Sequence, residues 1–226
     1  MRLAPVARWS ARVAAGLLLA ALVVAGPAHA GPPGSSNAYG KSLTEWMTLY
    51  MTWALGGDQE GQVGKVMFMP LPAGEPVDPE AAGTLDDPLT LRGEIDVTLK
   101  PGTAFAMPVA VWIGEYYEVG EDPYLPDSVF LDSDVLVRMD GKTIIDSDRD
   151  DLRKFYVPPT DFDPAIPYAE PTGYGALGAT FFQGIGFVHR PLSKGEHTMT
   201  LRSEIRVPEY NLWVIFENTW NITVSK

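Results

Sequence analysis

The stretch Tyr39–Gly57, YGKSLTEWMTLYMTWALGG, decides the fold because it is the one segment with a strong helical pattern. Ser42 followed by Glu45 is a capping box, in which each side chain binds a backbone amide that the first helical turn leaves unpaired. Gly56 and Gly57 suit the positive φ angles that end a helix. The sequence therefore predicts a single amphipathic helix within residues 39–57.

One stripe of this helix is apolar and aromatic. Its side chains recur at three- and four-residue steps, which places them on one face. They are Leu43, Trp46, Leu49 or Tyr50, and Trp53. Stacking of the Trp rings on a sugar is one use of such a face, and packing against a large apolar surface is the other. The helical spacing favours packing, and the strand-like remainder of the chain offers a sheet as that surface.

Residues 1–30 have the parts of a secretory signal peptide. A basic start precedes an apolar run, 14–24, that is shorter than a comfortable membrane span, and residues 28–30 read AHA, a small-x-small cleavage pattern. The arginines of the basic start are Arg2, Arg8 and Arg12. We expect cleavage after Ala30 and a periplasmic or extracellular product.

Cleavage would leave 226 − 30 = 196 residues, with a flexible tail over 31–38 and a single domain over 39–226. The formal net charge of this part is 14 − 29 = −15, which disfavours nucleic acid and anionic membrane surfaces as partners. The chain has no Cys, so disulfides, a Cys nucleophile and thiolate metal sites are excluded. No later stretch reads as a membrane span.

Most of the mature chain reads as strands. Leu89–Lys100 is the clearest, because apolar and polar residues alternate as in a strand with one wet face. The other expected strands are Val63–Met69, Phe105–Ile113 with a bulge or a locally unpaired position at Pro108, the hairpin Val135–Ile145, Thr180–His189, Glu196–Val207, and Leu212–Val224 as one bent strand or a pair. About eight strands predict a mainly β fold, a two-sheet antiparallel sandwich of jelly-roll type with the helix packed on it.

The connections also carry patterns. Asp140-Gly141 is typical of a two-residue hairpin turn, in which both residues have positive φ. Leu71–Asp87 and Glu115–Asp127 read as loops. Ser147–Gly178 has five prolines and reads as one long loop, which is uncommon in a compact domain and is often functional.

A family resemblance covers the two ends of the mature chain. Tyr39-Gly40-Lys41-Ser42 with Glu45-Trp46 and Trp53, and the late Gly195-Glu196-His197-Thr198, resemble a group of uncharacterised secreted bacterial proteins whose mature start reads Y-G-K-S-x-x-E-W. Members commonly have Cys and more Trp, whereas this chain has no Cys and has Tyr50 and Met51 where more Trp would stand. The resemblance implies an exported protein of this fold and no particular reaction.

The long loop Ser147–Gly178 contains the candidate ligand-binding residues. Its aromatic rings suit the apolar face of a sugar, and its carboxylates suit the hydroxyl groups. These residues are Tyr156, Phe162, Tyr168 and Tyr174 with Asp161 and Asp163. The alternative is a purely structural loop that folds down over an open sheet edge and prevents edge pairing.

Two metal hypotheses come from acidic and His residues. Alternating carboxylates at the two ends of the predicted hairpin suit Ca²⁺, which prefers six to eight oxygen ligands. They are Asp132, Asp134, Asp146, Asp148 and Asp150. The EF-hand pattern fails here, since Asp151 and Val157 stand where Gly and Glu are needed, so a solvated acidic turn is the alternative. His189 and His197 could face each other across a hairpin and bind Zn²⁺ or Cu²⁺.

Catalytic patterns are sparse. No G-x-S-x-G motif occurs. A carboxylate pair for glycoside hydrolysis would use Glu94, Glu115 or Glu118, which lie on or beside expected strands. The sequence therefore favours a secreted, non-catalytic binding or structural module with a glycan or a secreted protein as ligand and calcium as a candidate cofactor. The alternative is an extracytoplasmic, glycan-active hydrolase.

Overall fold

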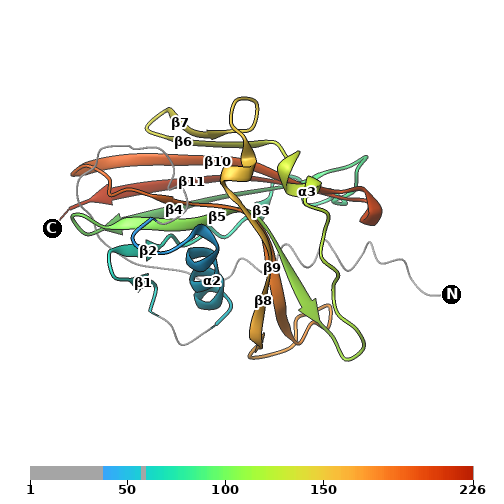
Figure 1. Cartoon of the computed structure of the whole chain (residues 1–226). Helices are drawn as coiled ribbons and strands as arrows, with labels where there is room; N and C mark the ends of the chain where they lie inside the picture. The colour runs from blue at the N-terminus through green and yellow to red at the C-terminus, as the bar shows by residue number, and fades with distance from the viewer. Residues whose placement is uncertain (1–37, 57–59, 226) are drawn as a thin grey trace.

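The structure is a computed structural model that describes residues 38–56 and 60–225 (Figure 1). The predicted signal peptide 1–30, the tail up to residue 37 and Gly57 lie outside these residues. In chain order the described elements are α2 (Leu43–Ala54), β1 (Gln62–Val63), β2 (Val66–Phe68), β3 (Glu75–Pro76), β4 (Leu89–Leu99), β5 (Ala104–Tyr116), α3 (Ser128–Leu131), β6 (Val135–Met139), β7 (Lys142–Asp146), η1 (Leu152–Lys154), β8 (Tyr156–Pro167), β9 (Gly178–His189), β10 (Gly195–Val207), η2 (Pro208–Tyr210) and β11 (Leu212–Val224). A membrane-spanning helix, judged by length and hydropathy, does not occur among them.

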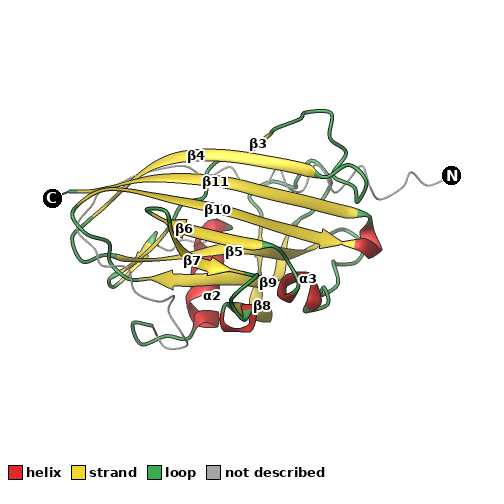
Figure 2. Cartoon of the chain, turned by 90° about the horizontal axis from the view of Figure 1, so that it is seen from above, coloured by secondary structure: helices red, strands yellow, loops and turns green. Residues whose placement is uncertain are grey.

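The strands of the described residues form two sheets. The five-stranded sheet has the order β1-β2-β5-β9-β8, and the six-stranded sheet has the order β3-β4-β11-β10-β6-β7. Figure 1 shows the six-stranded sheet, the five-stranded sheet and α2 as successive layers, and Figure 2 looks down on the six-stranded sheet with α2 behind it. The predicted β-sandwich with one packed helix is confirmed.

Both sheets are mixed, so the expectation of purely antiparallel pairing is wrong. β4 pairs with β11 in parallel over its whole length, and β2 pairs with β5 in parallel. A hairpin forces antiparallel pairing, but β4 and β11 are joined only by the long intervening chain, which permits either direction. Pairing of β11 with β10 is antiparallel, as their short connection requires.

The capping box of α2 is present as predicted. Ser42 Oγ accepts the Glu45 amide at 3.2 Å, and the Glu45 carboxylate accepts the Ser42 amide at 2.7 Å. The stripe faces the core: Trp46 is 2% exposed and Tyr50 is 1% exposed, whereas Trp53 is half-buried. The packing interpretation of the helix aromatics is therefore the correct one.

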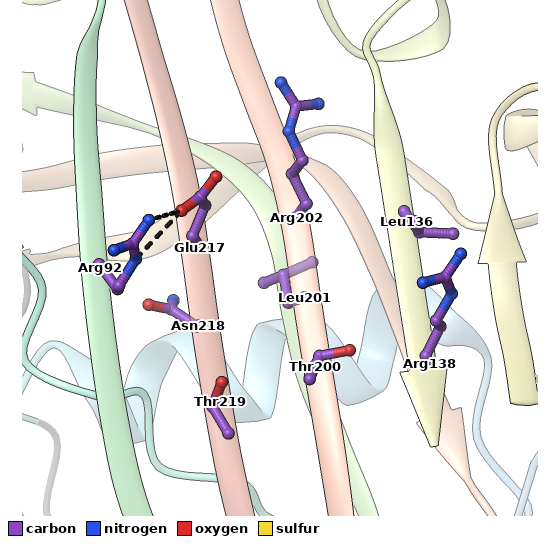
Figure 3. Close-up of a pocket in the computed structure, with 9 residues that line it drawn as sticks. All are labelled: Arg92, Leu136, Arg138, Thr200, Leu201, Arg202, Glu217, Asn218 and Thr219. Atoms are coloured by element: carbon purple, nitrogen blue, oxygen red, sulfur yellow. Dashed lines mark hydrogen bonds and ion pairs between the residues drawn. The ribbon is translucent and has the colours of Figure 1, made fainter. Parts of the chain in front are cut away.

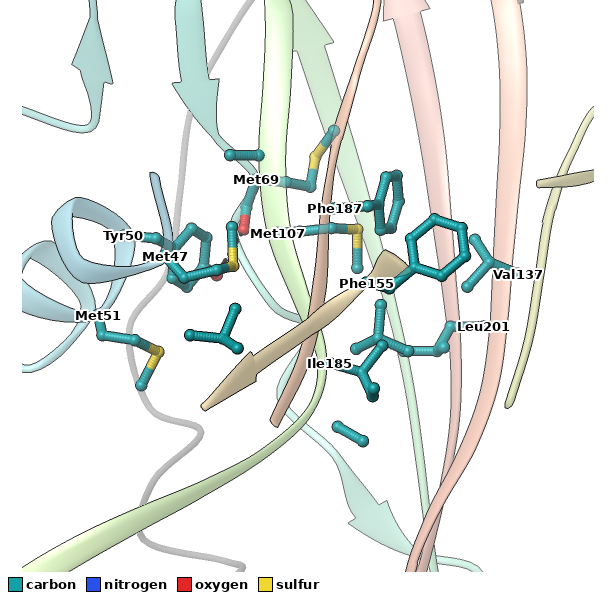
Figure 4. Close-up of a cluster of buried hydrophobic side chains, with 14 of the residues drawn as sticks. Met47, Tyr50, Met51, Met69, Met107, Val137, Phe155, Ile185, Phe187 and Leu201 are labelled. Atoms are coloured by element: carbon teal, nitrogen blue, oxygen red, sulfur yellow. Dashed lines mark hydrogen bonds between the residues drawn. The ribbon is translucent and has the colours of Figure 1, made fainter. Parts of the chain in front are cut away.

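The core has two layers on either side of the five-stranded sheet. Figure 4 shows Met47 and Tyr50 of α2 on one side of it and Val137 and Leu201 of the six-stranded sheet on the other. β5 is buried along almost its whole length because it lies between these layers. Gly186 on β9 allows α2 to approach, since a Cβ there would lie 2.4 Å from the sulfur of Met47.

The hairpin of β6 and β7 and the bulge in β5 are confirmed. Asp140 and Gly141 have φ angles of +52° and +74°, as the predicted turn requires. The register of β5 with β9 shifts between Pro108 and Ala110, because Pro has no amide to donate to the ladder. Leu212–Val224 is one strand.

The prediction of one long loop over Ser147–Gly178 is wrong. Residues 156–167 form β8, which is the edge of the five-stranded sheet and pairs with β9 through two register shifts. Prolines interrupt the alternating pattern of a strand, yet an edge strand tolerates them because one side of its backbone needs no partner. The same prolines discourage pairing with another chain, so the segment protects the edge by forming it and not by covering it.

Candidate binding site

The outer face of the six-stranded sheet contains a shallow hollow of about 300 Å³ (Figure 3). It lies across four neighbouring strands, β4, β11, β10 and β6. The outward side chains that line it are Arg92, Leu136, Arg138, Thr200, Arg202, Glu217 and Thr219. Strand spacing of about 4.8 Å makes this part of the sheet roughly 14 Å wide.

Strand alternation places these side chains on the outer face. In β10 the residues Met199, Leu201 and Ser203 are buried, so Thr200 and Arg202 between them point away from the core. Ser203 Oγ donates to the carbonyl of Val109 on β5 at 2.7 Å, which fixes the inner side of β10 against the other sheet. The opposite face is therefore the one available to a ligand.

Two cross-strand rows make up the hollow. In the first, Arg92, Glu217, Arg202 and Leu136 are aligned on successive strands. In the second, Glu94, Thr219, Thr200 and Arg138 are aligned in the same way, although Glu94 does not line the hollow. To the hollow the rows present three guanidinium groups, two hydroxyl groups, the carboxylate of Glu217 and the apolar side chain of Leu136.

The arginines of the hollow differ in their partners. The Arg92 guanidinium donates to Glu217 Oε2 at 2.5 and 3.1 Å, and Arg202 is paired with Asp134 outside the hollow. Within the part of the chain that the structure describes, Arg138 has no ion pair or side-chain hydrogen bond. Its donors are therefore available to a ligand.

The same face extends beyond the hollow in both directions. On one side Arg206 lies over the ring of Trp213 at 4.9 Å, and the indole N–H donates to Glu204 at 2.9 Å. On the other side Glu94 and Asp96 both accept from the amide of Asn221, at 2.8 and 3.0 Å. Glu94, a residue of the predicted catalytic carboxylate set, is thus an exposed residue of this face.

A second polar cluster surrounds Glu115 at the end of β5. Glu115 Oε1 accepts from the hydroxyls of Tyr168 at 2.9 Å and Tyr174 at 3.0 Å. The Tyr117 hydroxyl lies 3.4 Å from Glu115 Oε2 and 3.2 Å from an oxygen of Asp122. Burial and the charge of Glu115 raise the pKa of Tyr168. Glu115 and Asp122 are both buried, so the hydrogen bonds of this cluster hold residues 117–122 and 168–174 against the end of β5.

The residues of the predicted glycan platform, 156–174, make contacts within the protein. Phe162 is buried against Phe182, and the hydroxyl of Tyr156 donates to Asp127 at 2.5 Å. Burial and Asp127 raise the pKa of Tyr156. Asp161 accepts from Tyr124 at 2.7 Å, and Asp163 is exposed. Of the residues expected to share a ligand, those with contacts to other protein groups are Tyr156, Phe162, Tyr168, Tyr174 and Asp161.

The structure separates the predicted catalytic glutamates. Glu94 belongs to β4 in the six-stranded sheet, Glu115 to β5 in the five-stranded sheet, and Glu118 is exposed in the turn after β5. The carboxylate that lies near Glu115 is Asp122, which sequence reasoning missed. The chain turns back after Gly120, and this turn places Asp122 Oδ2 3.2 Å from the backbone nitrogen of Glu115, which donates to it.

The predicted calcium set does not converge. Asp146 Oδ1 accepts the amide of Asp148 at 3.2 Å, and Asp150 accepts the amide of Asp146 at 2.9 Å, as in a self-contained acidic turn. Asp134 is paired with Arg202, and Asp132 is exposed after α3. Among the described residues, three or more His, Asp or Glu side chains are nowhere arranged to hold a metal ion.

His189 and His197 have separate partners. His189 is buried, stacks on Phe105 at 5.0 Å, and lies 2.7 Å from the carbonyl of Arg190 through Nδ1. Burial lowers the pKa of His189. His197 binds Asp140 through Nδ1 at 2.6 Å. These contacts fit structural roles and not a shared metal site.

Sequence reasoning also missed the arginine hollow. No local sequence pattern distinguishes Arg92, Arg138 or Arg202 from the other polar residues of the strands. The order of the strands, which brings β4, β11, β10 and β6 side by side, creates the cluster.

Comparison with known proteins finds no family model that matches this chain and no similar curated protein. The resemblance to secreted bacterial proteins with a Y-G-K-S-x-x-E-W start therefore stays a prediction.

Proposed function

We propose that this protein is a non-catalytic binding module that holds a glycan on the outer face of its six-stranded sheet. The observation that carries the proposal is the hollow of about 300 Å³ lined by side chains from four adjacent strands. Sites that enclose small molecules occupy about 300–1,000 Å³. An open hollow at the lower end of that range suits a part of a longer ligand.

The chemistry of this face favours a glycan over a protein ligand. Thr200, Thr219 and the arginines offer hydrogen bonds to hydroxyl groups, while Leu136 is the main apolar side chain of the lining. Protein interfaces usually need a larger apolar centre. Trp213, already stacked with Arg206, provides an aromatic ring further along the same face.

Export is part of the proposal. The basic start, apolar run and AHA sequence of residues 1–30 support a cleaved signal peptide and a periplasmic or extracellular product. The resemblance to exported bacterial proteins supports the same location. Mass spectrometry of the protein from the native host tests this point, because cleavage after Ala30 predicts a mature N-terminus at Gly31.

A hydrolase is the second candidate. It is favoured by one observation: the carboxylates of Glu115 and Asp122 both lie within 3.4 Å of the Tyr117 hydroxyl. A hydrolase would release reducing ends from at least one glycan of a broad panel, and Glu115→Gln and Asp122→Asn would abolish that release. Absence of product with the unmodified protein contradicts this candidate.

A glycan array with the mature protein tests the binding proposal. Thr200→Trp fills the hollow, and we expect it to weaken binding by about tenfold or more. Val119→Trp is the matched control, because Val119 is 92% exposed in the turn after β5 and does not line the hollow. Circular dichroism of both variants verifies folding. Equal binding by Thr200→Trp and the unmodified protein would refute the assigned face, and a pull-down that yields only proteins would favour a protein ligand.

A further inference from the structure

We infer that the glycan held in the hollow is acidic, with a carboxylate group that binds Arg138 and with neutral sugars beside it. This inference rests on the function proposed above and names the class of ligand. It is carried by the charge of the hollow, by the available donors of Arg138, and by the acidic residues that follow on the same face.

The hollow is positively charged in an acidic protein. The whole sequence has 17 basic and 29 acidic residues. In contrast, the lining of the hollow has three arginines and one carboxylate, that of Glu217. Arg92 is paired with Glu217 and Arg202 with Asp134, so Arg138 is the lining arginine whose charge has no ion-pair partner among the described residues and can attract an anion.

Arg138 is the centre of this inference. It is exposed, lies directly across from Thr200, and has no ion pair within the described part of the chain. A guanidinium presents a planar fork of N–H donors that matches the two oxygens of a carboxylate. The hydroxyl of Thr200 beside it is suited to a neighbouring sugar hydroxyl.

The other two arginines are held in weak ion pairs, with which a bound anion can compete. The Arg92–Glu217 pair is at the surface, with side chains 63% and 35% exposed, and Arg202 is similarly paired with exposed Asp134. Surface ion pairs are weak because water screens them. Their guanidinium groups can therefore turn toward a ligand at low cost, and Figure 3 shows Arg92 and Arg138 at the two sides of the hollow.

The acidic residues next to the hollow restrict the charge density of the ligand. Glu94 follows Arg92 by two positions on the same face, a rise of roughly 7 Å, and Asp96 follows Glu94. A polyanion with a charge on every unit would meet these carboxylates, and like charges repel. A glycan in which acidic and neutral sugars alternate avoids this repulsion.

Matched acidic and neutral oligosaccharides test whether the ligand is an acidic glycan. Acidic oligosaccharides with alternating neutral sugars are compared with their carboxyl-reduced forms, which have the same backbone and no charge. We expect the acidic member to bind about tenfold or more tightly than the reduced member, with an affinity that falls as salt is raised. Oligogalacturonate, which has a charge on every sugar, is expected to bind more weakly than the alternating glycan. Equal affinity for an acidic glycan and its reduced form would overturn the inference and leave the binding module intact.

Substitution of Arg138 tests its role in binding the carboxylate of the glycan. Arg138→Gln is expected to weaken binding of the acidic member about tenfold while it leaves the affinity for the reduced member unchanged. Arg153→Gln is the control, because Arg153 is 76% exposed on η1 and does not line the hollow. An unchanged affinity of Arg138→Gln for the acidic member would contradict the role of this arginine.

A titration with monosaccharides separates the two proposals. Glucuronate is expected to shift the backbone amide signals of Thr200 and Thr219 in NMR spectra, whereas glucose is expected to shift them much less. If no oligosaccharide binds but glucuronate shifts these signals, the glycan function is wrong and the anion site stands. If neither happens, both proposals are wrong.

Discussion

The ring of His197 binds the carboxylate of Asp140, with 2.6 Å between Nδ1 and Oδ2, and so joins β10 to the turn between β6 and β7. The Nε2 atom of the same ring lies 2.9 Å from the carbonyl of Ser193. Two acceptors face the two ring nitrogens, which favours the doubly protonated imidazole. Burial lowers the pKa of His197, but these hydrogen bonds and the charge of Asp140 outweigh it and raise the pKa above its ordinary value.

A raised pKa makes the stability depend on pH. The contribution of His197 is fully present below the pKa of the unfolded chain, about 6.5, and is lost as the pH rises through the higher folded pKa. We therefore expect His197→Gln to reduce the free energy of unfolding more at about pH 5.5 than at about pH 9, as measured by urea denaturation.

Asp140→Asn provides the control for this pH effect. Asn tolerates the positive φ of the turn, so the variant removes the charge and keeps the backbone. It should abolish most of the same pH dependence. His189 acts in the opposite sense, because its lowered pKa destabilises the fold as the pH falls below the unfolded value. The largest cause of that lowered pKa is burial, which is the same in all these proteins and cancels in the difference. A pH-independent effect of His197→Gln would contradict the assignment.

Glu115 fastens the segment 168–177 to β5. Glu115→Gln keeps the size of the side chain but replaces the charged acceptor of Tyr168 and Tyr174, so we expect a loss of about 1–3 kcal/mol in the free energy of unfolding. Hydrogen exchange should become faster in 168–177. Glu118→Gln, at an exposed position, should change neither quantity.

The backbone of β9 at Gly184 excludes any side chain. Gly184 has a φ of +149°, and a Cβ there would lie 2.1 Å from the carbonyl oxygen of Ala110. We expect Gly184→Ala to destabilise the protein by about 1–3 kcal/mol or more. Gly173→Ala should be within about 0.5 kcal/mol of the original, because no atom lies within 4 Å of a Cβ at that position. Equal thermal unfolding of the two variants would argue against this strain.

The arginines of the hollow should contribute little to folding. The side chain of Arg92 is 63% exposed and that of Glu217 is 35% exposed, so Arg92→Gln should change the free energy of unfolding by about 1 kcal/mol or less. A large loss of stability in denaturant would instead assign Arg92 a structural role and weaken the case for a binding face.

Local sequence patterns predicted those elements whose cause is local. The Ser42–Glu45 capping box and the Asp140-Gly141 turn are confirmed, since each depends on residues within a few positions of one another. The strand β8 was missed because a segment with so many prolines is predicted as a loop when only its own residues are considered. It exists because β9 supplies a partner.

In the candidate sites, too, the residue types follow from the sequence, whereas their contacts depend on segments that are distant in the chain. The sequence shows the acidic and Tyr residues of the Glu115 cluster. The hydrogen bond between Glu115 and Tyr168, 53 positions away, forms only because the fold brings the two segments together. Arg92 and Glu217 are 125 positions apart and meet only because β4 lies parallel to β11.

The sequence by itself determined the helix, its apolar stripe, most strands and the two-sheet class, because hydrophobic periodicity and capping act over a few residues. Tertiary structure alone decided strand order, parallel or antiparallel direction, and which side chains share a face. Those features depend on contacts between distant segments, whose free energies arise only when the whole core packs.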